Sequence, residues 1–427
     1  MVPTPLFLPG SGHETVTQAA IIASDMPPAS PAADRSGRRK RRNALLLVLP
    51  LLIFTLVSFV APIVIMLARG VSEPEITRLL PLSRGPLATW DGTALPSDDT
   101  LAAVIADLAA AQRQRQAATI AKRLAAIRSD LRQPLLAAAR AAATPPGLTP
   151  EGLLALDTVW RDPASWRALA ELAQPFTDRY LLQTLDLTRN ASGEIVSVPD
   201  NQAIFLAALG RTFGIGLAVT LITLVLGYPL AYFICQQSPG LQRFMLLFVL
   251  LPFWTSVLVR TAAWLVVLQT NGLVNDTLMA LHVIGEPLKL VYTRSGTILG
   301  MVHIQLPFTL LPIYSVMQTI SPVYVRAARS LGATPTAAFW RVYVPQTLPG
   351  VAAGCLLTFI LCLGYYITPA ILGGPADQML SYYVAYYLNN EINWSMAAAV
   401  STVLLVLTIL FYIAYSWFTD PTAKATR

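Results

Sequence analysis

Histidine and cysteine are scarce in this chain of 427 residues, which contains three of each. The histidines lie far apart in the sequence, at His13, His282 and His303. The cysteines have no Cys-x-x-Cys spacing, so neither a zinc site nor a redox-active pair is expected. They fall in apolar stretches and are interpreted as small packing residues: Cys235, Cys355 and Cys362.

Several catalytic signatures are also missing. The sequence contains no Gly-x-x-x-x-Gly-Lys-Ser/Thr phosphate loop, so this chain is not expected to hydrolyse ATP. It contains neither a Gly-x-Ser-x-Gly elbow nor a His-Glu-x-x-His helix, which argues against a hydrolase. We therefore expect a protein that is not an enzyme.

Charge is the scarcest property and is unevenly distributed. Charged residues make up 12% of the chain and apolar residues 55%. Of the 23 acidic residues, 15 lie between Glu73 and Asp200. The long charge-poor runs elsewhere are typical of proteins that span a bilayer, which a helix crosses with about 20 apolar residues. Composition therefore predicts an all-α integral membrane protein.

Six apolar runs are predicted to span the membrane, at Ala44–Leu67, Ile204–Ile234, Phe244–Leu268, Thr297–Thr319, Thr347–Leu372 and Ser395–Phe418. The second run is long for one crossing, and its start before Arg211 is a candidate interfacial segment. Two Gly-x-x-x-Gly pairs, Gly210/Gly214 and Gly350/Gly354, are candidates for close helix packing.

The net charge of +7 raises the possibility of nucleic-acid binding, but its placement favours membrane anchoring. Residues 38–42 form a basic block directly before the first span, which predicts a cytoplasmic N-terminus. Residues 1–43 are predicted to be a disordered tail, with cytoplasmic loops at 235–243 and 320–346 and a cytoplasmic tail at 421–427. The outer loop at 373–394 contains no Lys or Arg, which supports this orientation.

Residues 69–200, called the insert below, have nearly balanced charge and no membrane span. Apolar residues recur there at helical spacing, at Leu101, Val104, Ile105 and Leu108 and again at Ile120, Leu124, Ile127 and Leu131. Thr149-Pro150 and Asp162-Pro163 each place a capping side chain before a first-turn proline. The insert is predicted to be a helical extracytoplasmic domain between spans one and two.

The segment 320–346, called the coupling loop below, carries strong start and stop signals for two short helices. Ser321-Pro322 starts the first and Gly332 ends it, and Thr334-Pro335 starts the second. Pro345 is predicted to stop the second helix near Val344. On the first helix, one face is predicted to hold Val325, Ala328 and Leu331, with Arg326, Arg329 and Ser330 pointing elsewhere. From these residues alone, docking to a protein and lying on lipid headgroups both remain open.

This loop resembles the cytoplasmic motif of permeases in binding-protein-dependent ABC importers of type I. The resemblance rests on Ala327-Ala328, Gly332, Phe339 and the stretch from Val342 to Pro345, and it extends over about residues 200–420. Arg326 stands where the family motif has glutamate, which puts the polar contacts of docking in doubt. The resemblance implies the six-helix permease fold in a bacterial inner membrane.

The resemblance also implies partners: a second permease, an ATPase dimer and an external solute-binding protein. ATP and Mg would bind the ATPase, and this chain would bind no cofactor or metal. The residues implied in coupling to the ATPase are Val325, Arg326, Ala327, Ala328, Arg329, Leu331, Gly332 and Pro345. Two hypotheses for the insert are contact with the binding protein and enlargement of the outer vestibule.

Within the family the chain looks most similar to the spermidine/putrescine permeases. The segments that carry this likeness are 271–275, 306–308, 311–314, 366–369 and 372–375. A small organic cation is therefore the expected solute, for which carboxylates and aromatic rings are suitable partners. The candidate pathway residues are Tyr365, Tyr366, Thr368, Asp377, Glu391 and Trp394.

Alternatives remain open from the sequence. Each pathway candidate could instead make helix–helix hydrogen bonds or anchor the membrane interface. The solute could be an amino-acid derivative, a phosphonate or an oxyanion. A secondary transporter would be expected to show inverted repeats, which are not evident, and a membrane scaffold would not need the two capped helices.

Overall fold

The computed structural model describes residues 46–190 and 194–419, so the predicted tails at 1–43 and 421–427 lie outside the described residues. The first apolar helix runs from Leu46 to Arg69. It contains a π-helical turn, η1 (Leu56–Val60), and ends in α3 (Ala61–Arg69). Its length and composition are sufficient to cross a bilayer.

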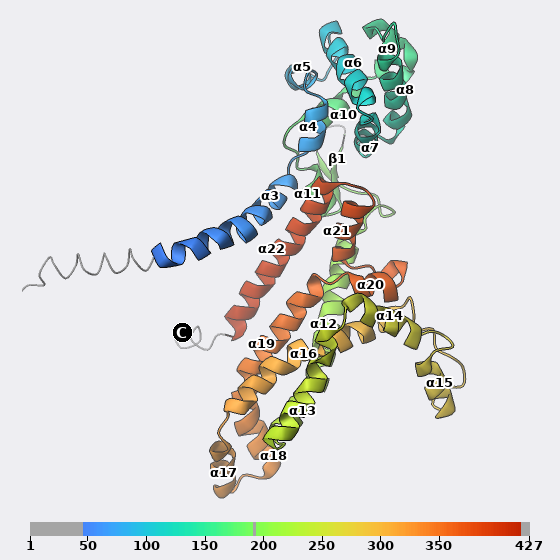
Figure 1. The fold of residues 1–427 in the computed structure, drawn as a ribbon. Helices are drawn as coiled ribbons and strands as arrows, with labels where there is room; N and C mark the ends of the chain where they lie inside the picture. The colour runs from blue at the N-terminus through green and yellow to red at the C-terminus, as the bar shows by residue number, and fades with distance from the viewer. Residues whose placement is uncertain (1–45, 191–193, 420–427) are drawn as a thin grey trace, which may run out of the picture. The chain divides into compact units, whose positions relative to one another are not determined.

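The insert is built mainly of short helices (Figure 1). They are α4 (Pro74–Leu79), α5 (Arg84–Thr89), α6 (Asp98–Arg113), α7 (Ala117–Ala125), η2 (Ser129–Leu131), α8 (Arg132–Ala143), α9 (Pro150–Leu156), η3 (Thr158–Arg161), α10 (Pro163–Ala173) and α11 (Arg179–Gln183). The predicted caps are confirmed: Thr149 Oγ1 accepts from Gly152 N at 3.1 Å, and Asp162 Oδ1 accepts from Ala164 N at 2.9 Å.

The insert has its own hydrophobic core. The periodic residues predicted for its helices pack there, with Leu101, Leu108 and Leu124 at most 1% exposed and Ile127 partly buried. Trp160 and Trp166 are fully buried, with ring centroids 5.3 Å apart. An antiparallel pair, β1 (Leu187–Arg189) and β2 (Ile195–Ser197), which was not predicted, follows the helices.

The remaining residues form the membrane core. Its helices are α12 (Phe205–Cys235), α13 (Pro239–Leu250), η4 (Leu251–Trp254), α14 (Val257–Val267), α15 (Leu273–Ala280), α16 (Arg294–Thr319), α17 (Pro322–Ser330), α18 (Pro335–Ala338), η5 (Phe339–Tyr343), α19 (Val344–Leu363), α20 (Ile367–Leu372), η6 (Pro375–Asp377), α21 (Leu380–Asn389) and α22 (Trp394–Thr419). Helices α12, α16 and α19 pack against one another. Among the described residues, five helices are long and apolar enough to span a membrane, and a bent pair makes a sixth, as predicted.

Small and hydroxyl residues join the three packed helices. Thr309 Oγ1 on α16 lies 2.8 Å from Thr223 Oγ1 on α12 and 2.6 Å from Thr358 Oγ1 on α19. A Cβ added at Gly354 would stand 2.6 Å from Thr309 O, so this glycine permits close approach, as predicted. Gly210 and Gly214 face open space, and the packing predicted for them is not found within the described chain.

Two predicted spans are not continuous helices. The span predicted at Phe244–Leu268 is α13–η4 and α14, bent by 97°. Pro252 lacks a backbone donor, and Thr255 and Ser256 adopt ψ angles of 144° and 140°, which interrupts the helix. The span predicted at Thr347–Leu372 breaks after α19, since Gly364 is its C-cap and Tyr366 starts α20. By contrast, α12 is a single helix, so the segment before Arg211 is not separate.

Candidate functional site

The coupling loop folds as its capping residues predict at the first helix. Ser321 Oγ accepts from Val323 N at 3.4 Å, and α17 begins at Pro322. Gly332 ends the segment with φ of +92°, a conformation that side-chain-bearing residues rarely adopt. Thr334 Oγ1 then accepts from the first turn of α18 at 3.3 Å. The loop is therefore a pair of defined helices.

The second helix does not stop near Val344, contrary to the prediction. It passes through the π-helical turn η5 into α19, with Val344 N bonded to Phe339 O. Pro345 lies in the first turn of α19, where a missing backbone donor costs little. Tyr232 on α12 packs against Phe339 and Tyr343, with ring centroids 5.2 and 5.3 Å away. The loop is thus continuous with one membrane helix and packed on another.

The faces of α17 also differ from the prediction. A groove of about 710 Å³ lies between the coupling loop and the ends of α12, α13 and α16. We call it the basal groove; its loop side is formed by Pro322, Val325, Arg326, Arg329, Phe339 and Tyr343. Val325 therefore borders the same groove as both arginines, and Arg329 lies on its face one turn further along the helix, at i+4. Leu331 is 88% exposed, since it follows the last helical residue.

The remaining coupling candidates lie in the same short segment. Ala327 is exposed and Ala328 is half-buried, so the two residues lie on different sides of α17. Ala327 O accepts from Leu331 N at 3.1 Å, and Ala328 O accepts from Ala333 N at 3.1 Å. The small side chains leave the outer side of α17 accessible, and the assignment of these residues to coupling stays a prediction.

A second group of polar residues lies where α14, α16 and α20 meet. Thr368, a predicted pathway residue, is fully buried and its Oγ1 lies 3.0 Å from Thr261 Oγ1. Trp264 Nε1 donates to His303 Nδ1 at 3.1 Å. Polar groups inside membrane-spanning segments are costly and often functional. The helix breaks at 255–256 and 364–366 bring these side chains together.

Two buried polar atoms near these breaks, and one on α16, have no hydrogen-bond partner in the described part of the chain: Arg260 Nε and Tyr365 Oη near the breaks, and Gln305 Oε1 on α16. Unpaired buried groups are rare, so each requires an explanation. Arg260 was not predicted as a site residue. The signal was present, because Arg260 is the sole charged residue in the span predicted at 244–268. Tyr366, beside Tyr365, is 41% exposed.

The other predicted pathway residues lie elsewhere and already have partners. Asp377 Oδ1 accepts from Arg294 Nε at 2.9 Å. Glu391 lies 2.6 Å from Lys122 of the insert and accepts from Tyr386 Oη at 3.1 Å. Their hydrogen bonds, that of Lys122 foremost, lower the pKa of Glu391. The structure therefore does not bring these carboxylates together with Tyr365 and Thr368.

Trp394 belongs to the junction between the insert and α22. The guanidinium of Arg69 lies 5.6 Å from its ring centroid, a cation–π distance. Arg123 of the insert donates to Ile392 O at 2.9 Å. In the same region Ser395 Oγ donates to Ser72 O at 2.8 Å. These contacts attach the insert to the loop before α22.

Within the described residues, no three His, Cys, Asp or Glu side chains are grouped as metal ligands. The geometry thus consists of a structured loop at the ends of membrane helices and a polar region where spans are broken. Such an arrangement is typical of transporters, in which interrupted helices line the solute site.

Comparison with known proteins identifies the family. Residues 223–420 match the model for the "Binding-protein-dependent transport system inner membrane component". "Spermidine/putrescine transport system permease protein PotB" of Salmonella typhimurium is 31% identical over 242 residues, covering 55% of this chain and 84% of that protein. "Inner membrane ABC transporter permease protein YdcU" of Escherichia coli is 30% identical over 239 residues, 51% of this chain and 71% of that protein.

A solved bacterial alginate ABC transporter, in complex with an alginate pentasaccharide-bound periplasmic protein, shows a more distant likeness. Its matching chain is 18% identical, with a TM-score of 0.43 over 52% of this chain and 80% of that chain. The family assignment rests instead on the sequence relatives, which this chain covers over more than two thirds of their length. The chain belongs to the inner-membrane permeases of binding-protein-dependent ABC importers and is related to the polyamine permeases among them.

Proposed function

We propose that this chain is the permease subunit that carries a polyamine, or a similar small organic cation, through an ATP-driven importer. The observation that carries the proposal is the 31% identity to a spermidine/putrescine permease over 84% of its length. A solute-binding protein would deliver the cation, and a second permease would complete the pathway. ATP and Mg would bind an ATPase dimer, and no cofactor or metal would bind this chain.

The proposed orientation places both termini and the coupling loop in the cytoplasm and the insert in the periplasm. The outward side of α17, with Val323 55% and Tyr324 56% exposed, is the surface proposed to dock on the ATPase. Because η5 continues into α19, a push on the loop would move that membrane helix. The insert is proposed to contact the binding protein.

Two of the three unpaired groups, unlike the Arg260 guanidinium, suit a cationic solute. Gln305 Oε1 and Tyr365 Oη can both accept a hydrogen bond from an ammonium group. Trp264 and His303, with ring centroids 5.5 Å apart, lie near the same break and offer aromatic faces. Asp377 and Glu391 stay candidate cation partners, but a solute would first have to displace Arg294 or Lys122.

The test is purification of the tagged chain with its co-purifying proteins, followed by reconstitution in proteoliposomes. Uptake of labelled putrescine should require ATP and the binding protein, and Q305L should reduce it because leucine removes the acceptor. L299A, at a 43% exposed site on the same helix, is the control. Uptake without ATP would contradict the importer assignment, and ATP-dependent uptake of a different solute would contradict the polyamine assignment alone.

A further inference from the structure

The two faces of α17 have different chemistry. Pro322, Val325, Arg326 and Arg329 line the basal groove, whereas Val323 and Tyr324 are exposed on other sides of the helix. The spacing of the groove residues, at i, i+3, i+4 and i+7, is that of one helical face. The basic side chains of this helix therefore border the groove beneath the membrane helices.

No acidic residue of the lining elements can neutralise these two arginines. The groove is formed by α12, α13, α16 and the coupling loop. The sequence has no Asp or Glu in residues 201–275 or 287–376, which include all of these elements. Within the described chain, neither Arg326 nor Arg329 has an ion-pair or hydrogen-bond partner on its side chain. The groove thus carries two uncompensated positive charges.

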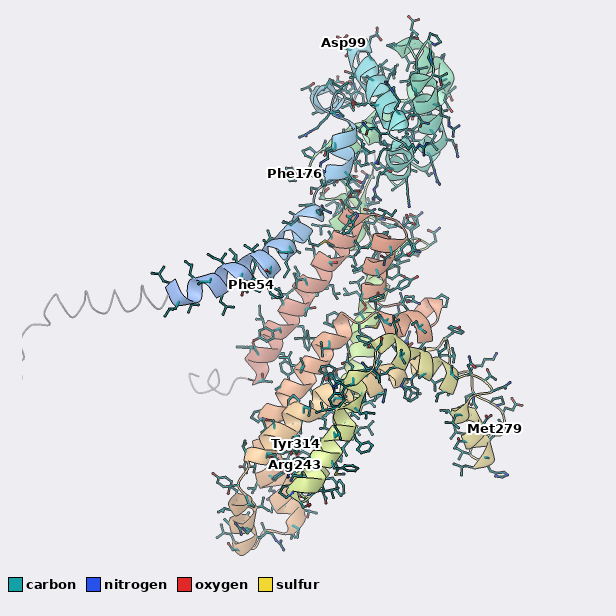
Figure 2. All side chains as sticks on the ribbon, in the orientation of Figure 1. Phe54, Asp99, Phe176, Arg243, Met279 and Tyr314 are labelled. Atoms are coloured by element: carbon teal, nitrogen blue, oxygen red, sulfur yellow. The ribbon has the colours of Figure 1, made fainter. Side chains whose placement is uncertain are left out.

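Two polar side chains of the groove wall, Gln242 and Gln318, are already paired with each other and with Tyr314. Gln318 Nε2 donates to Gln242 Oε1 at 2.8 Å and to Tyr314 Oη at 2.6 Å. Tyr314, which lies toward the same end of the core as Arg243 in Figure 2, also donates to Gln242 Oε1 at 3.2 Å. These groups hold α13 and α16 together and leave the guanidinium donors available for an anion.

Part of the groove wall is apolar, and the groove lies at the ends of helices that can span a membrane. Val325, Phe339 and Met317 contribute to its lining. The helices that end there, α12 and α16, are both long and apolar enough to span the bilayer. Figure 1 shows α17 and α18 at that end of α12, α16 and α19. A ligand suited to this groove combines an anionic head with an apolar chain.

We propose that the basal groove binds an anionic phospholipid, with its phosphate between Arg326 and Arg329 and an acyl chain against the apolar wall. Guanidinium groups pair well with phosphate oxygens, and basic pockets between membrane helices suit anionic headgroups. The lipid would brace the loop against the membrane helices. On this proposal Arg326, which replaces the glutamate of the family motif, serves the groove and not the docking surface.

The test compares R326Q/R329Q with R341Q in the full-length chain. Arg341 is exposed on the same loop but does not line the groove, so its variant removes a nearby charge only. Each chain is reconstituted in phosphatidylcholine nanodiscs containing a minor share of cardiolipin, and the bound lipid is counted by native mass spectrometry. The double variant should bind cardiolipin about tenfold or more weakly, whereas R341Q should match the wild type.

Two further arms separate the alternatives. Excess inorganic phosphate should not displace the lipid, and displacement by phosphate alone would show that the groove selects a free anion. The co-purified ATPase is measured in parallel. If R326Q/R329Q keeps its cardiolipin but loses the ATPase, the arginines contact the protein partner and the lipid proposal is wrong. An equal loss of lipid in R341Q would also overturn it, because binding would then follow net charge.

Discussion

At the scale of single residues, one buried carboxylate organises the junction between the insert and the membrane core. The side chain of Glu73 is 4% exposed. It lies 3.2 Å from Arg123 and 3.3 Å from Arg179, and it accepts from Tyr180 Oη at 2.5 Å. Burial raises the pKa of Tyr180, which therefore stays neutral and donates. The cluster connects the start, middle and end of the insert.

Substituting this carboxylate should destabilise the junction. E73Q leaves the buried guanidinium of Arg123 without a counter-charge and Arg179 with only Glu171, 3.8 Å away, which costs about 3–5 kcal/mol. Thermal unfolding of the purified chain in detergent measures the loss. E151Q changes an exposed carboxylate of the insert and should shift stability by about 0.5 kcal/mol or less. Equal effects of the two substitutions would show that the cluster is dispensable.

The ion pair between Lys122 and Glu391 should make the attachment of the insert sensitive to acid. The pKa of Glu391 is lowered from 4.5, so its stabilising contribution is present above that value and is lost as pH falls through the lower folded-state pKa. Because both side chains are partly exposed, the pair contributes about 1 kcal/mol or less. The stability difference between wild type and E391Q should therefore close in acid; a difference that persists there would point to another cause.

At the scale of elements, the end of α17 depends on glycine. G332A places a side chain at φ of +92°, which costs about 1–2 kcal/mol locally and should distort the coupling loop. ATP-driven uptake should fall while the amount of folded protein in the membrane stays constant. G240A, at a glycine with open space around it, is the matched control. Normal uptake by G332A would show that α17 can end without a glycine at this position.

The contact between α16 and α19 depends on a second glycine. A methyl group at Gly354 would stand 2.6 Å from Thr309 O, so G354A should force the helices apart and cost about 1–3 kcal/mol. Unfolding in detergent measures this cost. G214A adds the same methyl group where nothing lies within 4 Å and should be nearly neutral. Similar stabilities of the two variants would contradict the packing argument.

Element boundaries were predictable where side chains act locally. Ser321, Thr149 and Asp162 cap the helices that they were predicted to start. The breaks inside two spans were missed because an apolar run has the same composition whether its helix is straight or bent. The continuation through Pro345 was missed because a π-helical turn is not signalled by propensity.

At the scale of the whole molecule, most of the insert can be deleted between two residues that lie close together. Thr177 N donates to Val71 O at 2.9 Å, and Ser72 forms an antiparallel β-bridge with Phe176. Because these contacts hold the two ends of the segment together, a short linker can replace residues 75–175. Residues after 178 must stay, because Asp186 caps α12 by accepting from Phe205 N at 3.0 Å. The deletion therefore spares the membrane core.

The chain that lacks residues 75–175 should remain folded in the membrane, but its affinity for the binding protein should fall. Size-exclusion chromatography in detergent checks the fold, and titration of the binding protein against ATPase rate checks the function. A chain that lacks residues 75–175 yet keeps both transport and binding-protein affinity would contradict the proposed role of the insert.

The sequence by itself determined the class of this protein, because apolar length, charge depletion and capping signals act over a few neighbouring residues. It identified the six spans, the helices of the insert and the coupling loop. Only the tertiary structure decided which groups meet: Glu391 pairs with Lys122, 269 residues away, and not with the polar residues near Thr368. It likewise turned Arg326 toward the basal groove. Such pairings depend on how separate helices pack, and a pattern within a few neighbouring residues does not specify them.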